Sequence, residues 1–583
     1  MSPLSQRLQP ASETIHVTSP YDGRVVGRVQ PASAEAILAA VRRAHVAQAE
    51  FAFSTPAQRR DLLNALAAAI ASEAESLAQL ICAEVGKTIA EARNEVRRAQ
   101  NTLRLSGDAA TFLDGEVLHC GIVAGGANRQ AVITYEPTGV VGAITPFNYP
   151  LNLLCHKLGP AIAAGNAVVA KPSPKAPLAA QRLAELALEA GFPAGLFQVV
   201  HGAAAEAITL ARAPIDLLSF TGGSAAGLAL KNAAGLVRCL MELGGNDPLF
   251  VMPDADLPSA INTAIAQRYE IAGQSCAAVK KLYLHADIHD AMLDALVEAA
   301  KAVRHGDPLD PATRMGPVID AQSAAHVRAR IEAATASGAR LLVGGTGQGA
   351  MLAPTVMADV PPDSDLFAQE TFGPVISVRR FTDVGAAIAE VNAGAHGLQA
   401  GVFSNDHAVL KRFSRELRVG GVMINEGPDF RTEHVPFGGI KGSGLGREGV
   451  RIALREMSET KVVIDWGRGH QCALQFSGPP AGSAPVWSKP SSPIRAWNWR
   501  QPTCRPARPG SAVRSAIPLS NTGRPKRAST PIATPSSISP RHQAASTCSA
   551  WSASGPFPSS SALPALPMPT WPKSMPRPAT ARS

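Results

Sequence analysis

The spacing of apolar residues divides the first 465 residues into alternating helix-like and strand-like segments. Between residues 56 and 105, apolar side chains recur three and four positions apart among Ala, Leu, Glu and Arg, which predicts two or more long amphipathic helices. From residue 139 onward, short β-branched runs alternate with helical stretches, as in GVVGAIT followed by PFNYPLNLLCHKLGPAIAAG. This order predicts a parallel, doubly wound α/β sheet with helices on both faces.

The same alternation recurs further along the chain, from about residue 246 to residue 435. It indicates a second α/β domain. A chain of 583 residues of which 46% are hydrophobic can bury more than one core, which agrees with this division. No internal sequence repeat is apparent.

The C-terminal region, residues 466–583, follows no such pattern. It contains 14 Lys and Arg, no Asp or Glu and all six tryptophans in a Pro-, Ser- and Ala-rich background. Residues 467–583 are therefore expected to form a disordered basic tail. The rest of the chain is mildly acidic, although the whole chain has a formal charge of +9. Because the tail also lacks a regular basic-aromatic pattern, we favour a shifted reading frame over a nucleic-acid-binding arm.

Cysteine usage and hydropathy argue against several protein classes. The eight cysteines form no CxxC pair and no Cys/His cluster, so free thiols are expected rather than a disulfide framework or a metal site. The N-terminus has no apolar signal-peptide core. No later apolar run reaches the ~18 residues of a membrane helix. We therefore expect a cytoplasmic protein without a membrane partner.

The loops that follow strands hold candidate binding residues, because ligands of parallel sheets bind at the carboxyl ends of the strands. AVVAKPSPKAP ends a strand on Lys171 and continues with prolines that would hold this cation over the strand end. SFTGGSAAG follows a strand and opens a helix, where Gly222, Gly223 and Gly227 leave N–H groups free for a pyrophosphate. Either loop by itself is also typical of a tight strand-to-helix turn.

The stretch GQSCAAVKK raises the question of what Cys276 does. A single cysteine of this kind is most often a packed core thiol. It could also be a metal ligand or a nucleophile, and the nucleophile requires an accessible thiol of lowered pKa. The residues of this stretch alone leave these alternatives open.

Seven motifs in register decide, by resemblance, between the alternatives for Cys276. The chain resembles the aldehyde dehydrogenase superfamily over residues 12–466 through PTGVVGAITPFNYP, AAGNAVVAKPSPKAP, FTGGSAAG, MELGGNDP, GQSC, QETFGPV and VPFGGIKGSGLGREG. The resemblance implies the aldehyde dehydrogenase fold, with a Rossmann-like cofactor domain, an α/β catalytic domain and a small oligomerisation element in a homodimer or homotetramer. The implied boundaries are 1–117 and 137–245 for the cofactor domain, 118–136 and 455–466 for the oligomerisation element, and 246–454 for the catalytic domain.

The resemblance also implies the catalytic residues. Cys276 would be the nucleophile that forms a thioester, and Asn148 would stabilise the oxyanion together with the Cys276 backbone N–H. Glu242 would be the general base for thioester hydrolysis. The alternative for Glu242 is a solvated carboxylate, but the glycines that follow it favour the active site.

NAD or NADP is the implied cofactor. Pro174 stands where many NAD-preferring relatives carry a glutamate, so repulsion of a 2′-phosphate is absent and both cofactors remain open. The implied cofactor-binding residues are Thr145, Pro146, Phe147, Lys171, Ser173, Gly222, Gly223, Ser224, Gly227, Gly244, Glu370 and Phe372.

The substrate is expected to be an anionic aldehyde, because Arg98, His156 and Arg431 fall at positions that face the aldehyde in relatives. The pattern is similar to phosphonoacetaldehyde dehydrogenases, except that Ser275 replaces an arginine usual before the cysteine. Succinate semialdehyde, lactaldehyde and glyceraldehyde 3-phosphate are therefore rival substrates. A structural or nucleic-acid-binding protein is the non-enzymatic alternative, and it is disfavoured by the presence of the three catalytic residues.

Overall fold

The helical region predicted between residues 56 and 105 forms three helices in the computed structural model, which describes residues 13–127 and 129–466. Thr55 and Thr88 each cap a helix in a capping box, which satisfies the free N–H groups of its first turn. The three helices are α2 (Pro56–Ser72), α3 (Ala74–Val85) and α4 (Ile89–Ala110).

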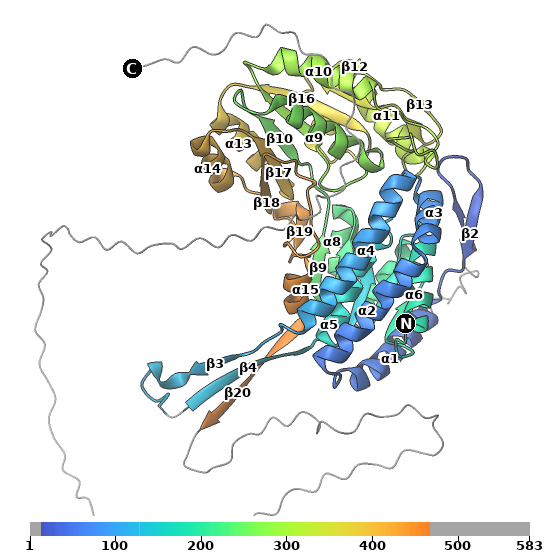
Figure 1. Ribbon diagram of the computed structural model, residues 1–583, viewed down its shortest axis with the longest axis vertical. Helices are drawn as coiled ribbons and strands as arrows, with labels where there is room; N and C mark the ends of the chain where they lie inside the picture. The colour runs from blue at the N-terminus through green and yellow to red at the C-terminus, as the bar shows by residue number, and fades with distance from the viewer. Residues whose placement is uncertain (1–12, 128, 467–583) are drawn as a thin grey trace, which may run out of the picture. The chain divides into compact units, whose positions relative to one another are not determined.

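The predicted doubly wound sheet has six strands in the order β19-β9-β8-β5-β6-β7. All neighbours are parallel except β19 and β9. Its strands are β5 (Val140–Ile144), β6 (Ala167–Lys171), β7 (Phe197–Val199), β8 (Leu217–Thr221), β9 (Arg238–Glu242) and β19 (Gly444–Leu445). The helices packed against it are α1 (Ala34–Phe51), α5 (Asn152–Ala164), α6 (Leu178–Glu189), α7 (Ala204–Arg212) and α8 (Ser224–Ala234) (Figure 1).

The second α/β region contains a seven-stranded sheet in the order β12-β15-β16-β11-β10-β17-β18. Only the pair of β12 and β15 is antiparallel among its neighbours. Its strands are β10 (Pro248–Val251), β11 (Lys281–His285), β12 (Arg340–Val343), β15 (Thr355–Ala358), β16 (Val375–Phe381), β17 (Gln399–Phe403) and β18 (Gly421–Ile424). The helices of this region are α9 (Leu257–Tyr269), α10 (His289–Lys301), α11 (Ala321–Ala336), α12 (Asp365–Ala368), α13 (Val384–Ala393) and α14 (His407–Glu416).

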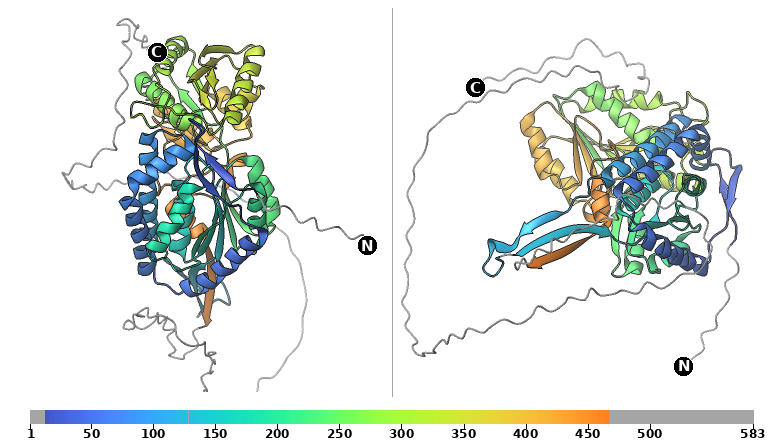
Figure 2. Two further views of the ribbon diagram at one scale, coloured as in Figure 1. Left: turned by 90° about the vertical axis from the view of Figure 1, so that its right-hand side faces the viewer. Right: turned by 60° about the horizontal axis from the view of Figure 1, so that its bottom comes forward.

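The segments expected to form the oligomerisation element pair with one another in a three-stranded antiparallel sheet. It consists of β3 (Glu116–His119), β4 (Arg129–Pro137) and β20 (Ser458–Trp466). Figures 1 and 2 show these strands extending away from the six-stranded sheet. Their role in oligomerisation stays a prediction. Two small hairpins complete the strands, β1 (Ile15–Thr18) with β2 (Val25–Val29) and β13 (Gly347–Gln348) with β14 (Met351–Leu352).

One segment departs from the expected division at residue 454. β19 adds to the edge of the six-stranded sheet, and α15 (Val450–Glu456) packs against α4 and α5. The chain therefore returns to the first sheet before β20. Gly444 permits this approach, since a β-carbon there would lie 2.3 Å from the Met241 carbonyl oxygen.

Three further expectations concern the cysteines, membrane-spanning helices and the C-terminal tail, and the described residues cover only part of what they concern. The five cysteines described, Cys82, Cys120, Cys155, Cys239 and Cys276, are free. Within residues 13–127 and 129–466 no single helix is long and apolar enough to cross a membrane, although α2 and α3 meet that length and composition test as a pair bent by 74°. The predicted tail, residues 467–583, lies outside the described residues.

Candidate active site

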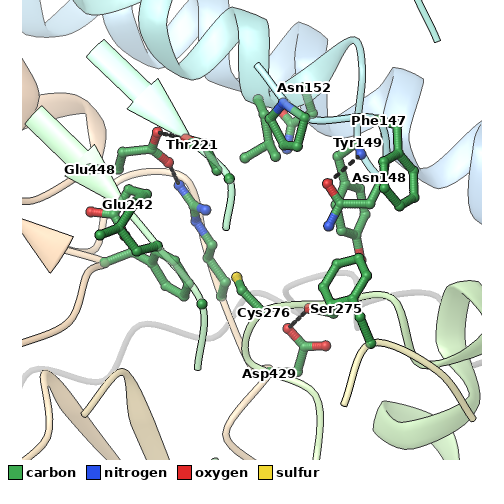
Figure 3. A pocket seen from close by; sticks show the side chains of 18 of the residues that line it. Phe147, Asn148, Tyr149, Asn152, Thr221, Glu242, Ser275, Cys276, Asp429 and Glu448 are labelled. Carbon is green, nitrogen blue, oxygen red and sulfur yellow. Dashed lines mark hydrogen bonds and ion pairs between the residues drawn. The ribbon is translucent and has the colours of Figure 1, made fainter. Parts of the chain in front are cut away.

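A cavity of about 320 Å³ lies beside the carboxyl ends of β8 and β9, the loop after β5 and the loop before β11 (Figure 3). Thirteen of the predicted site residues line it. They are Cys276, Asn148 and Glu242 from the catalytic set, Pro146, Phe147, Gly222, Gly223, Gly244, Glu370 and Phe372 from the cofactor set, and Arg98, Ser275 and Arg431 from the substrate set. Residues up to several hundred positions apart therefore share one cavity.

Cys276 follows a turn with an unusual backbone. Ile271 and Ala272 have φ angles of 48° and 52°, a conformation that costs about 1–3 kcal/mol for a non-glycine residue. Gly273 has a φ of 74°, and a β-carbon there would lie 2.3 Å from a backbone carbonyl oxygen. Glu91 Oε1 accepts the Ile271 N–H at 2.9 Å. Glu91, a residue of α4, thus helps to hold the turn before the cysteine in one conformation.

The Cys276 side chain is a thiol rather than a thiolate at neutral pH. Burial raises its pKa, and the charge of Asp429 raises it further, whereas Lys280 acts in the opposite direction. Lys280 Nζ donates to the Ser275 carbonyl at 2.9 Å and the Cys276 carbonyl at 2.5 Å. Because the thiolate is the nucleophilic form, attack by this cysteine requires a proton acceptor.

Asn148 lies in the loop after β5, on the other side of the cavity from Glu242 (Figure 3). Its Nδ2 donates to the Gln274 carbonyl at 2.8 Å, and its Oδ1 accepts the Tyr149 N–H at 3.1 Å. A side-chain amide carries two N–H donors. One therefore orients the amide, and the second can serve an oxyanion beside Cys276.

Glu242 is the last residue of β9 and is 4% exposed. Its Oε2 is buried and has no hydrogen-bond partner within the described part of the chain. Burial raises the pKa of this carboxyl well above its usual value, and the charge of Glu448 raises it further, while Arg431 and Lys157 oppose the rise. A carboxyl with a raised pKa can exchange protons near neutral pH, as a general base must.

Glu448 belongs to a buried ion-pair network that the sequence did not reveal. We call Glu448, Lys157, Arg431 and Thr221 the Glu448 network. Lys157 Nζ lies 3.0 Å from Glu448 Oε1 and 2.7 Å from Thr221 Oγ1, and Arg431 Nη2 lies 2.8 Å from Glu448 Oε2. Although burial acts to raise it, the two cations lower the pKa of Glu448 below its ordinary value. Glu448 is therefore ionised beside Glu242.

A second group of charges lies near Ser275, and three of its members, Asp429, Glu270 and Arg98, line the cavity. We call Asp429, Glu270, Glu433 and Arg98 the Asp429 cluster. Arg98 Nε donates to Glu433 Oε1 at 2.7 Å, so this predicted substrate arginine is already paired. Ser275 Oγ donates to Asp429 Oδ1 at 2.9 Å. Burial and the charge of Glu270 raise the pKa of Asp429 to about 6, despite the opposing effects of Ser275 and nearby cations.

Several of the predicted cofactor residues have a geometry that suits a nicotinamide dinucleotide. The 11-residue helix α8 has no side-chain cap, so the N–H groups of its first turn remain available next to Gly222 and Gly223. Such N–H groups bind phosphate. A β-carbon on Gly244 would lie 2.1 Å from Glu370 Oε2, so a larger residue there would displace this carboxylate. Phe147 meets the Phe372 ring edge-to-face at 6.0 Å. These features fit a bound nicotinamide dinucleotide.

The remaining predicted residues lie outside the cavity lining. Lys171 Nζ donates to the carbonyls of Pro172 at 2.9 Å and Gly202 at 2.8 Å, and burial lowers its pKa to about 8. Ser173 Oγ accepts the Lys175 N–H at 3.2 Å. The others are Thr145, whose Oγ1 is buried without a described partner, Ser224, which donates to the Gly442 carbonyl at 3.0 Å, and Gly227, which packs on Leu243.

His156 lies on α5, one turn beyond the cavity residue Asn152. It is 1% exposed, and neither ring nitrogen has a hydrogen-bond partner among the described residues. Burial lowers the pKa of the ring well below its ordinary value, and Arg431 lowers it further. The ring is therefore neutral, with one nitrogen able to donate and the other able to accept.

Comparisons with known proteins identify the family of the chain. The family model described as "Aldehyde dehydrogenase family" matches residues 8–463. Sulfoacetaldehyde dehydrogenase from Neptuniibacter caesariensis is 40% identical over 457 residues, which cover 78% of this chain and 100% of that protein. Aspartate-semialdehyde dehydrogenase 1 from Pseudomonas canavaninivorans is 39% identical over 451 residues, which cover 77% of this chain and 96% of that protein.

Solved structures give the same answer for the fold. The NADP-dependent glyceraldehyde-3-phosphate dehydrogenase from Bacillus halodurans C-125, complexed with NADP, matches with a TM-score of 0.76 and 34% identity over 78% of this chain and 96% of that one. The NAD-dependent aldehyde dehydrogenase from Sinorhizobium meliloti matches with a TM-score of 0.75 and 36% identity over 80% and 93%. The chain therefore belongs to the aldehyde dehydrogenase family, as an NAD(P)-dependent aldehyde dehydrogenase.

Proposed function

We propose that this enzyme oxidises a short aldehyde that carries an anionic group, with Cys276 as the nucleophile. The observation that carries the proposal is Arg431, which lines the cavity and whose buried Nε–H has no partner among the described residues. Its guanidinium lies 4.1 Å from the centre of the Phe437 ring, which fixes its plane. Because an unsatisfied buried donor costs about 1–3 kcal/mol, an anion that accepts this hydrogen bond is favoured. His156 offers a second unpaired donor nearby.

In the proposed reaction, the Cys276 sulfur forms a bond to the aldehyde carbon as the thiol proton passes to solvent water in the cavity. Asn148 Nδ2 and the Cys276 N–H donate to the oxygen as it gains negative charge. Gly222, Gly223, Glu370 and Phe372 would hold a nicotinamide cofactor, which would supply a hydride acceptor. Cys276 would then hold the acyl group as a thioester. Glu242 then accepts a proton from water, which attacks the thioester and releases the carboxylic acid.

The charge of the preferred anion follows from Ser275. Where phosphonoacetaldehyde dehydrogenases usually have an arginine, Ser275 holds the carboxylate of Asp429. A dianionic phosphonate would meet repulsion at this wall, whereas a sulfonate or carboxylate carries one charge less. The two relatives reported above are named for sulfoacetaldehyde and aspartate semialdehyde, which are short aldehydes with such a group. We therefore rank monoanionic aldehydes above phosphonoacetaldehyde and glyceraldehyde 3-phosphate.

A panel of aldehydes assayed with NAD and with NADP tests the substrate class. Sulfoacetaldehyde and succinate semialdehyde should give kcat/KM values at least about tenfold above propanal, since a charge-assisted hydrogen bond contributes ~1.5–3 kcal/mol. The kcat/KM values for phosphonoacetaldehyde and lactaldehyde should fall between those of the two monoanionic aldehydes and that of propanal. Equal kcat/KM for propanal and the anionic aldehydes would contradict the proposal.

Two variants test the residue roles. Cys276→Ala should lose several orders of magnitude in kcat while cofactor binding persists, because no other nucleophile is available. Glu242→Gln should keep the burst of reduced cofactor and slow the steady-state rate. Loss of the burst in Glu242→Gln would show that Glu242 is needed before hydrolysis, for instance to take the thiol proton.

A further inference from the structure

We infer that the preferred aldehyde also carries an ammonium group, which Asp429 and Glu270 bind on the wall of the cavity across from the Glu448 network. This inference rests on the proposed function and names its substrate class more narrowly. The expected molecule is a short amino-acid aldehyde with one negative and one positive group.

The balance of charge in the Asp429 cluster supports this inference. The single guanidinium of Arg98 pairs with Glu433 at 2.7 Å. Glu270 and Asp429 have neutral partners instead, namely the Tyr149 hydroxyl at 3.2 Å and the Ser275 hydroxyl at 2.9 Å. No Lys, Arg or His nitrogen within residues 13–127 and 129–466 approaches either carboxylate within 4.0 Å. Two carboxylates thus line the cavity without an ion pair.

An unsatisfied acceptor gives an independent indication. Asp429 Oδ2 is buried and has no hydrogen-bond partner among the described residues. Its other oxygen is already bound by Ser275. A buried carboxylate oxygen without a donor is costly, and a substrate ammonium would supply both the donor and the missing charge. Burial and the charge of Glu270 raise the pKa of Asp429 to about 6, although Lys280 and Arg98 act to lower it from a distance.

The positions of the two unpaired groups fit one small molecule. In Figure 3, Cys276 lies between Glu448 on one side and Asp429 on the other. Arg431 offers its free Nε–H from the Glu448 network, and Asp429 offers its free Oδ2. An aldehyde carbon placed at the Cys276 sulfur can therefore carry an anion that faces Arg431 and an ammonium that faces Asp429. The carboxylate and ammonium of an α-amino acid diverge from one carbon in this way.

The wild-type enzyme tests the inference with two probes that differ only in the amino group. Aspartate semialdehyde and succinate semialdehyde share the same carbon chain and carboxylate. We expect kcat/KM at pH 8 to be about tenfold or more higher for aspartate semialdehyde, because the ammonium gains a desolvated charge pair. An equal or lower value overturns the inference but leaves the proposed function intact. If both probes are no better than propanal, the proposed function itself fails.

Variants assign the preference to the named carboxylates. Glu270→Gln and Asp429→Asn should each lower the ratio of the two kcat/KM values about tenfold, since each removes one charge and keeps the shape of the side chain. Glu332→Gln, which changes an exposed carboxylate on α11, is the matched control and should leave the ratio at its wild-type value. A ratio that is unchanged in both cavity variants overturns the assignment, and either variant suffices if the other does not fold.

Discussion

The two walls of the cavity contain the same kinds of charged side chain in opposite proportions. In the Glu448 network, Lys157 and Arg431 share one carboxylate, and the pKa of Glu448 is lowered although the group is buried. In the Asp429 cluster, one guanidinium accompanies three carboxylates, and the pKa of Asp429 is raised to about 6. Burial alone therefore does not decide which carboxylates are ionised. What differs is that two cations bond Glu448 directly, whereas Asp429 bonds a hydroxyl and is affected by the negative charge of Glu270.

The Glu448 network affects the pKa of its neighbour Glu242. Glu242 is buried beside an ionised carboxylate, so its own pKa rises while that of Glu448 falls. Neighbouring carboxylates whose pKa values are pushed apart can separate a proton-accepting role from a purely electrostatic one. On the opposite wall, the excess of carboxylates has no such internal balance, and a ligand has to supply it.

The largest effect is expected from removing a cation of the balanced wall. Lys157→Met should reduce the free energy of unfolding by about 3–5 kcal/mol, because it leaves Glu448 buried with one cation fewer. Urea denaturation of the full-length enzyme measures the change. The double variant Lys157→Met/Glu448→Gln removes the uncompensated charge as well and should recover part of the loss. A single variant within about 1 kcal/mol of wild type would show that the pair is not a net source of stability.

A change to Glu448 should alter the pH dependence of turnover. In Glu448→Gln, the negative charge that raises the pKa of Glu242 is gone, while Lys157 and Arg431 remain. The pKa of Glu242 should fall, so the acid limb of the kcat profile should move to lower pH. Glu433→Gln, on the other wall, should leave that limb in place. Movement of the limb to higher pH in Glu448→Gln would mean that Glu448 does not act on Glu242 through its charge.

Much of the fold could be predicted from local sequence patterns. β5, β6 and β8 are each five residues long and buried along their whole length. A strand buried on both faces reads as a continuous apolar run, which is a strong local signal. The return of β19 to the first sheet could not be predicted in this way, because its two residues carry no periodicity and pair with a strand about 200 positions earlier.

The charged part of the site was largely missed for a similar reason. Lys157 and Glu448 are 291 positions apart, and Ser275 and Asp429 are 154 apart. No local pattern connects such residues. Lys157 nevertheless left a signal, since every residue of α5 is buried and a lysine in a buried helix needs a counter-charge. The pairing of Arg98 with Glu433 had no signal of this kind, so the arginine was expected to be free for substrate.

The unbalanced wall should make substrate preference depend on pH. The Asp429 carboxyl is affected by Glu270, Ser275, Lys280 and Arg98, and its pKa is raised to about 6. Below this pH Asp429 is protonated, and this wall of the cavity loses one negative charge. The ratio of kcat/KM for aspartate semialdehyde to that for succinate semialdehyde should therefore fall roughly tenfold between pH 8 and pH 5. Measuring the ratio cancels pH effects common to both substrates. A ratio that stays flat over this range would mean that Asp429 does not bind the ammonium.

The smallest effect is expected from the hydrogen bond that holds Asp429. Ser275→Ala removes the donor to Asp429 Oδ1, a loss of about 1 kcal/mol. Because a hydrogen bond to the charged form of a carboxyl lowers its pKa, the pKa of Asp429 should rise further. The midpoint of the pH-dependent preference should then shift to higher pH, while kcat for succinate semialdehyde changes less than fivefold (~1 kcal/mol). Ser259→Ala is the control, since it breaks the 2.7 Å Ser–Asp hydrogen bond at the exposed start of α9 and should not move the midpoint. A shift to lower pH in Ser275→Ala would mean that the serine hydroxyl does not stabilise the Asp429 carboxylate.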